Sequence, residues 1–185
     1  CAAAAKEGHI GVLEWARMRG CPWDERTCEA AAAGGHQDLL RWLRENSCPW
    51  DARACTMASA AGNLDLLKWL RSEGCPWSIG TTHAAAYGGH SRVFGWALAS
   101  GGTGCPWDAS TCAAAATDGH LDVLQWARAQ GCPWDKETCT AAASGGHLDL
   151  LRWARTHACP WDKETCSVAA EEGHDEALHW ALENG

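Results

Sequence analysis

Apolar residues recur along the chain with the spacing of amphipathic helices, in blocks separated by glycine and proline. Residues 132–158 show the pattern. Asp135 can cap a first helix, glycine ends it at Gly145 and Gly146, and a second helix begins near His147. No stretch alternates apolar and polar residues in the manner of a half-buried strand. The pattern therefore predicts an all-α protein built from pairs of short helices.

The helix pairs belong to a repeat. The tripeptide Cys-Pro-Trp recurs every 27 residues, with one spacing of 30, and a Gly-His pair recurs in the same phase. The longer spacing results from an insertion at 102–104, at the end of the fourth unit. We expect a single repeat domain over 1–185. Its predicted units are 1–20, 21–47, 48–74, 75–104, 105–131, 132–158 and 159–185.

One helix pair is too small to bury its own apolar face, so the units must stack on one another. Each second helix carries a tryptophan, which we expect to be sandwiched between neighbouring units. The alanines of the first helices allow close approach of neighbouring helices. These helix tryptophans are Trp15, Trp42, Trp69, Trp96, Trp126, Trp153 and Trp180.

The unit resembles the ankyrin repeat. The resemblance rests on Ala-Ala-x-x-Gly-His at 142–147 and on the aliphatic pair, Trp-Ala and closing glycine at 123–131. The unit is shorter than the usual repeat of about 33 residues and lacks the Thr-Pro-Leu-His opening and the residues of the β-hairpin finger. The resemblance implies an ankyrin-like α-solenoid of about seven stacked helix-turn-helix repeats without full β-hairpin fingers. It also implies a protein-binding or scaffolding role without chemistry.

Composition and the absence of certain motifs exclude several classes of function. The net charge of −8 opposes binding to nucleic acid, whose phosphates need clustered lysine and arginine. No apolar segment reaches membrane-spanning length and no basic leader is present, so we expect neither membrane insertion nor secretion. We therefore expect an intracellular protein in a reducing compartment, the cytoplasm or the nucleus. We find no phosphate loop or nucleophile elbow and expect no enzyme activity and no cofactor.

The 12 cysteines allow three interpretations. Cysteine and histidine are zinc ligands, but a Cys-x6-Cys spacing is not a short zinc clip, and Thr82 and Asn63 interrupt the two series. A second interpretation is a series of disulfides. Pairing within units leaves Cys1 and Cys75 without a partner, and pairing from one unit to the next leaves Cys105 and Cys166 without one. We expect free, buried thiols, with a metal-binding Cys/His array as the less favoured alternative.

Two further rows of residues follow the repeat. An arginine row (Arg17, Arg44, Arg71, Arg128, Arg155) recurs together with two rows of aspartates. We expect these charges to complement helix dipoles and to pair between units. A row of tryptophans follows proline in the loops. These side chains either form an exposed aromatic ladder or, as we expect, pack down over the space of the missing hairpin.

Comparison of the units with one another identifies a candidate binding surface. Positions 5, 9 and 13 of each unit vary most, and their spacing places them on one face of the first helix. In the fourth unit they are Ile79, His83 and Tyr87, the last being the only tyrosine of the chain. The predicted partner-binding residues are Ile79, His83, Tyr87, Arg92, Lys136 and Lys163. We expect a scaffold for a protein partner, with a structural subunit of a larger assembly as the alternative.

Overall fold

The computed structural model describes residues 1–100 and 105–184, and the insertion at 102–104 lies outside these residues. All regular elements within the described ranges are helices, as predicted. The first helices of successive units are α1 (Ala2–Lys6), α3 (Glu25–Ala33), α5 (Ala52–Ala60), α7 (Ile79–Tyr87), α9 (Ala109–Thr117), α11 (Lys136–Ser144) and α13 (Lys163–Glu171). The second helices are α2 (Ile10–Met18), α4 (Gln37–Glu45), α6 (Leu64–Ser72), α8 (Ser91–Ala99), α10 (Leu121–Ala129), α12 (Leu148–Thr156) and α14 (Asp175–Asn184).

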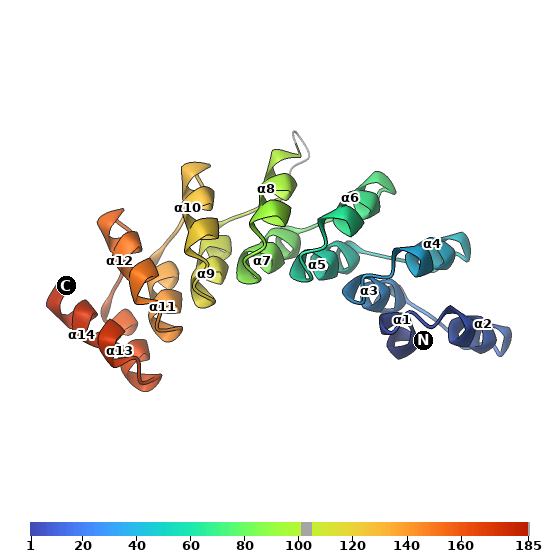
Figure 1. The fold of residues 1–185 in the computed structure, drawn as a ribbon, viewed down its shortest axis with the longest axis horizontal. Helices are drawn as coiled ribbons and strands as arrows, with labels where there is room; N and C mark the ends of the chain where they lie inside the picture. Colours follow the sequence, from blue (N-terminus) through green and yellow to red (C-terminus); the bar gives the residue numbers. More distant parts are fainter. Residues whose placement is uncertain (101–104, 185) are drawn as a thin grey trace.

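The helix pairs stand side by side along a curved array whose two ends lie far apart (Figure 1). The odd-numbered helices line the inner side of the curve and the even-numbered helices the outer side. Each odd-numbered helix contacts the next one along the array. Alanine-rich first helices approach one another more closely than second helices that carry leucine and tryptophan, so the array bends toward its first helices. The predicted α-solenoid is confirmed.

The predicted helix ends are also present. In α11, Asp135 is the N-cap and its carboxylate accepts a hydrogen bond from the backbone N–H of Glu137 at 3.0 Å. The helix ends at Gly145, and Gly146 follows with a φ of +67°, which glycine adopts without strain. The second helix then begins after His147. Each unit therefore turns its chain between the two helices with glycine, and the first helices from α3 to α13 start with an aspartate or serine cap.

The core consists of leucine from the second helices and alanine, cysteine and threonine from the first helices. Stacking of units creates most of this burial. Leu39 in α4 is 2% exposed, whereas Val12, at the same position of the preceding unit, is 51% exposed. Leu39 has a unit packed on its N-terminal side, and the described residues place no such unit beside Val12. The interface between units is therefore where the apolar surface is removed from water.

The expectation that the helix tryptophans are sandwiched between units is wrong. The fully buried large side chains are Phe94, leucines and valine, whereas Trp15 is 55% and Trp126 36% exposed and the other helix tryptophans are partly buried. In α6, for example, Leu66 and Leu67 fill the narrow gap between helices one turn away from Trp69, because an indole ring is too large for this gap. The tryptophan lies at the edge of the core, on the outer side.

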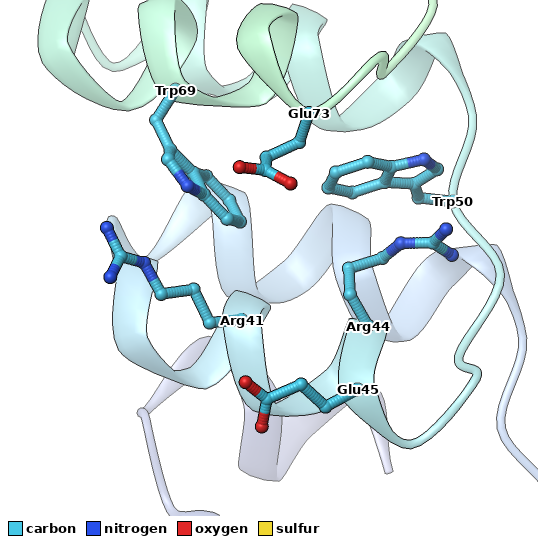
Figure 2. A pocket seen from close by; sticks show the side chains of 6 residues that line it. All are labelled: Arg41, Arg44, Glu45, Trp50, Trp69 and Glu73. Atoms are coloured by element: carbon cyan, nitrogen blue, oxygen red, sulfur yellow. The ribbon is translucent and has the colours of Figure 1, made fainter.

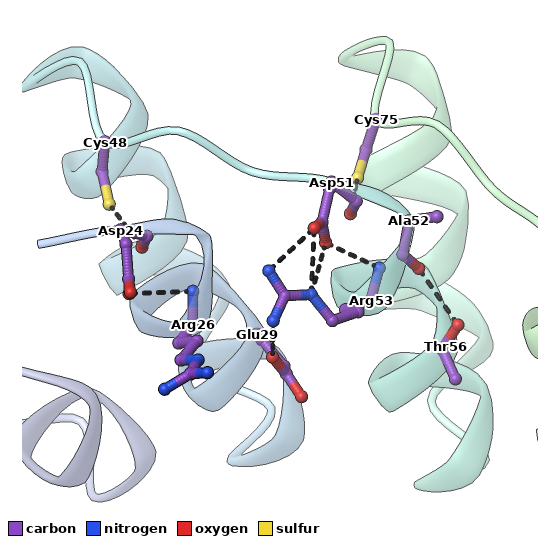
Figure 3. Close-up of polar contacts among 9 residues, drawn as sticks. All are labelled: Asp24, Arg26, Glu29, Cys48, Asp51, Ala52, Arg53, Thr56 and Cys75. Carbon is purple, nitrogen blue, oxygen red and sulfur yellow. Dashed lines mark hydrogen bonds and ion pairs between the residues drawn. The ribbon is translucent and has the colours of Figure 1, made fainter.

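A charged cluster at the start of α5 joins two units (Figure 3). The Arg53 guanidinium lies 2.8 Å from the carboxylate of Asp51, the N-cap of its own helix, and 3.1 Å from Glu29 of α3. The hydrogen bond from the Arg53 side chain holds the pKa of Asp51 below its ordinary value. The contact between Arg53 and the ionised Asp51 therefore stabilises the folded protein at pH values above the ordinary aspartate pKa. This stabilisation is lost as the pH falls through the lower pKa that Asp51 has in the folded protein.

This cluster predicts a measurable acid sensitivity. Asp51→Asn keeps an oxygen that can cap α5 but removes the titrating charge. We expect the melting temperature of the variant to fall less than that of the wild type as the pH is lowered from about 4 to about 2. Thermal unfolding followed by circular dichroism across this range measures the difference. Identical pH dependence in the two proteins would contradict the assignment.

Candidate partner-binding surface

The variable row of the first helices lies on the surface, and all three of its residues in α7 are exposed. Ile79 is 37% and Tyr87 47% exposed, and His83 between them is also exposed. The three residues follow one another at intervals of four, so α7 presents them on one face. The structure therefore brings together three of the six residues predicted for partner binding.

The neighbouring helices leave this face uncovered because their residues in the same row are small. The row carries Ala52, Thr56 and Ala60 in α5, and Ala109, Ala113 and Thr117 in α9. Close packing accompanies the small side chains: a Cβ atom built at Gly80 of α7 would lie 3.2 Å from the Thr56 hydroxyl oxygen. The larger side chains of α7 consequently project beyond those of the two helices beside it. Across these three units the row carries no acidic or Lys/Arg residue.

The other three predicted residues lie elsewhere. Arg92 is exposed near the start of α8, a second helix, and is not part of the first-helix row. Lys136 in α11 is held by ion pairs to Asp162 at 2.9 Å and Glu164 at 3.1 Å, and these carboxylates raise its pKa. Lys136 therefore joins the sixth unit to the seventh.

Lys163, like Lys136, belongs to the first-helix row; it lies at the start of α13, where it is exposed. It lies three units along the array from α7. Ser167 and Glu171 follow it in the row and are exposed as well. The first-helix row thus has a neutral stretch around α7 and charged residues toward the C-terminal end of the array.

The arginine row does not pair with aspartate, which corrects the expectation from the sequence. Each arginine lies over the loop tryptophan of the following unit, with its guanidinium carbon 4.1–4.4 Å from the ring centroid. Each also donates a hydrogen bond to the carbonyl oxygen of the cysteine that opens that unit, as Arg44 does to Cys48 at 2.7 Å. Cation–π contacts of this kind contribute about 0.5–2 kcal/mol.

The loop tryptophans pack against the second helix of their own unit, as expected. Five pairs of loop and helix tryptophans meet edge to face, with ring centroids 5.6–6.1 Å apart. The fourth unit has Leu98 in place of the arginine. At its junction with the fifth unit, Trp126 instead meets Phe94 edge to face at 5.6 Å.

Grooves open between neighbouring second helices, and Figure 2 shows one of them from close by. The groove between the second and third units has a volume of about 460 Å³ and is lined by Arg41, Arg44, Glu45, Trp50, Trp69 and Glu73. The Glu73 side chain points into the space between the two indole rings. A similar groove of about 350 Å³ between the fifth and sixth units is lined by Gln125, Arg128, Ala129, Trp134, Trp153 and His157. The first groove is lined by two arginines, two glutamates and two tryptophans, so its charges balance and favour neither a cationic nor an anionic ligand.

The repeated histidines connect neighbouring units. The Nε2 atoms of His36, His90, His147 and His174 lie 2.8–3.0 Å from backbone carbonyl oxygens near the end of the first helix of the preceding unit. The rings lie directly against glycines: at Gly145, an added Cβ would be 2.4 Å from Nε2 of His147. This agrees with the expectation that histidine links backbone groups of adjacent turns.

All 12 cysteines are free thiols. Where the fourth unit has Thr82 instead of cysteine, burial raises the pKa of the facing Cys105. Across residues 1–100 and 105–184, no group of three or more His, Cys, Asp or Glu side chains is placed to hold a metal ion. None of the helices in this part of the chain is long and apolar enough to cross a membrane.

Comparison with known proteins agrees with this architecture. Residues 28–71, which run from α3 to α6, match the family model described as ankyrin repeats (many copies). No curated protein matches the chain.

Proposed function

We propose that this chain, an ankyrin-like repeat protein, is a non-catalytic scaffold that binds a protein partner through Ile79, His83 and Tyr87 of α7. Ankyrin repeats generally mediate protein–protein interaction, and the first-helix row supplies a continuous surface for it. The single observation that carries the assignment to α7 is the exposure of an isoleucine and the only tyrosine beside small neighbouring side chains. Tyrosine is enriched among the residues that contribute most to binding.

The character of this surface defines the partner we expect. Since Ile79, His83 and Tyr87 lie in an uncharged stretch of the row, the partner should place an apolar side chain there. Charged groups at the edge of an interface affect the association rate more than the affinity. We therefore assign Arg92 and Lys163 a peripheral role in the complex. Lys136 contributes mainly by fixing α11 to the following unit through its ion pairs.

The proposal is tested with a displayed library of random peptides selected against the wild-type protein. Affinities of the selected peptides are then measured by fluorescence anisotropy. We expect the double substitution Ile79→Ala and Tyr87→Ala to weaken binding at least about tenfold, or about 1.4 kcal/mol. The matched control is the double substitution Lys68→Ala and Gln125→Ala, which changes exposed residues of the second helices on either side of α8.

Circular dichroism establishes that both variants retain their helices. Affinities reduced in the α7 variant and unchanged in the control support the proposal. Selected peptides that bind the α7 variant as tightly as the wild type would show that the partner surface lies elsewhere on the array.

A further inference from the structure

Counted from the Cys-Pro-Trp cysteine as position 1, most units carry a second cysteine at position 8, such as Cys28 in the second unit; Cys1 is its equivalent 27 residues earlier. The cysteine at position 8 of one unit lies beside the first cysteine of the next unit. Cys1 and Cys21 show this directly, with their sulfur atoms 3.4 Å apart. Four further pairs occupy the same two positions of the repeat: Cys28 with Cys48, Cys55 with Cys75, Cys112 with Cys132 and Cys139 with Cys159. In each pair the neighbouring thiol shifts the pKa of its partner, and the Cys55 sulfur lies 4.0 Å from the carbonyl oxygen of Cys75. In every pair the two cysteines are 20 residues apart in the sequence. The pairs therefore form a ladder in which each rung joins two units.

In the four buried pairs the backbone holds the second thiol in place, as where Cys48 donates to the carbonyl oxygen of Asp24 at 3.6 Å. The sulfur of Cys75 donates to the carbonyl oxygen of Asp51 at 3.4 Å, and Cys132 and Cys159 make the equivalent contact, also at 3.4 Å. Figure 3 shows the Cys75 contact at the start of α5. Because a disulfide bond is about 2.05 Å long, the sulfur atoms of Cys1 and Cys21 must each move by about 0.7 Å to bond.

The junction between the fourth and fifth units interrupts the ladder. Thr82 replaces the eighth-position cysteine there, and its hydroxyl donates to the carbonyl oxygen of Pro106 at 2.6 Å. Cys105, the thiol that would complete this rung, makes the same backbone contact as the other first cysteines and donates to the carbonyl oxygen of Ser78 at 3.0 Å. Cys166, in the last unit, has no following Cys-Pro-Trp cysteine to pair with in this sequence.

We infer that the five thiol pairs are redox-modification sites that a small-molecule disulfide such as oxidised glutathione converts into five disulfides between successive units, leaving Cys105 and Cys166 reduced. In each pair, one thiol loses its proton and attacks a glutathione sulfur, which forms a mixed disulfide and releases one glutathione. The second thiol loses its proton and attacks the protein sulfur of that bond, which releases the second glutathione. Each rung thus gives up two electrons and two protons to two glutathione thiols.

Exposure sets the order of reaction. Cys1 and Cys21 are half-buried, whereas the cysteines of the other four pairs are fully buried. Their sulfur atoms are closed off from solvent, so glutathione cannot reach them while the units remain packed. The outer rung reacts first, and the buried rungs react only as their units open transiently.

Oxidation would then leave one junction without a disulfide. Units one to four become cross-linked in one block and units five to seven in another. The junction between α7 and α9 remains held by packing and by hydrogen bonds such as that from Thr82 to Pro106. The ladder does not depend on the proposed partner surface, so the two proposals stand or fall separately.

The test uses the full chain, fully reduced and then exposed to excess oxidised glutathione. Samples are quenched with N-ethylmaleimide at intervals, and peptide mass spectrometry identifies the linked and alkylated cysteines. We expect Cys1–Cys21 to link at least about tenfold faster than the buried pairs, and the end state to carry alkyl groups on Cys105 and Cys166 alone. Links within units, such as Cys21 with Cys28, or loss of the Cys105 thiol would overturn the inference.

A gain-of-function variant provides a second test that does not depend on loss of structure. Thr82→Cys restores the residue found at this position in the other units and should produce a sixth link, to Cys105. The control, Ser110→Cys, places an additional thiol at an exposed position of α9. We expect the control thiol to be alkylated and the five links to be unchanged. Failure of Thr82→Cys to link to Cys105 while the other five links form would contradict the geometry of the ladder.

Discussion

Phe94→Ala is expected to lower the free energy of unfolding by about 3–5 kcal/mol, the range for truncating a buried phenylalanine. Phe94 is 1% exposed and meets Trp126 of the next unit edge to face. It lies at the junction that lacks both the arginine of the row, replaced by Leu98, and the paired cysteine, replaced by Thr82. Within the described residues, Phe94 is also the largest fully buried side chain.

The consequence for cooperativity is specific to this junction. In a repeat array each unit is stabilised mainly by its neighbours, so weakening one junction separates the two halves. We expect the urea unfolding of Phe94→Ala to become two transitions. The matched control is Leu67→Ala, at the equivalent position of the third unit, where about 2–5 kcal/mol is lost but the arginine and cysteine contacts remain. A single transition in Phe94→Ala, with a loss below that of Leu67→Ala, would contradict this account of the junction.

Gly145→Ala is expected to lower the free energy of unfolding by about 2–4 kcal/mol, because the added methyl group overpacks the site and breaks a hydrogen bond. A Cβ at this position would lie 2.4 Å from Nε2 of His147 and 2.6 Å from the carbonyl oxygen of Thr117. These are the two groups that join the fifth and sixth units at 3.0 Å. The backbone oxygen cannot move aside without disturbing α9, so the histidine contact is lost.

Gly11→Ala provides the contrasting case. Gly11 lies inside α2, and nothing is within 4 Å of a Cβ added there. Alanine is a better helix former than glycine, so we expect this variant to be unchanged or more stable by up to about 1 kcal/mol. Chemical denaturation of both variants measures the difference. Equal effects of the two substitutions would show that the histidine contact does not hold the units together.

Much of the fold could be predicted from local signals. Asp135, Gly145 and His147 mark helix ends because capping and left-handed turns depend on a few neighbouring atoms. The spacing of repeats then determines how the helices stack. The exposed row of α7 could also be predicted, because comparison of units separates positions that stacking requires from those it leaves free.

The position of the tryptophans could not be predicted in the same way. An apolar pair and a tryptophan share one turn of each second helix, and periodicity alone does not determine which of them enters the gap between helices. The arginine contacts have the same origin, since they depend on where the loop tryptophan lies. One signal was present: in five units the arginine precedes the loop tryptophan by a constant six residues, as Arg44 precedes Trp50.

Two surfaces of the array carry aromatic residues: the inner row at α7, and the outer grooves between units, lined by paired indole rings. In the outer grooves, edge-to-face packing and arginine stacking already involve the rings. Tyr87 is 47% exposed and takes part in no aromatic pair within the described residues. This difference is why we propose the first-helix row at α7, and not the outer grooves, as the partner surface.

Hydroxyl-radical footprinting of the chain, alone and with a selected peptide bound, measures most directly which surface receives the partner. The reaction oxidises tyrosine and tryptophan, so Tyr87 reports on the inner row, while Trp69 and Trp153 report on the outer grooves in the same sample. A bound peptide should reduce oxidation of Tyr87 and leave both tryptophans unchanged. Protection of the tryptophans with Tyr87 unaffected would place the binding surface on the opposite side of the array.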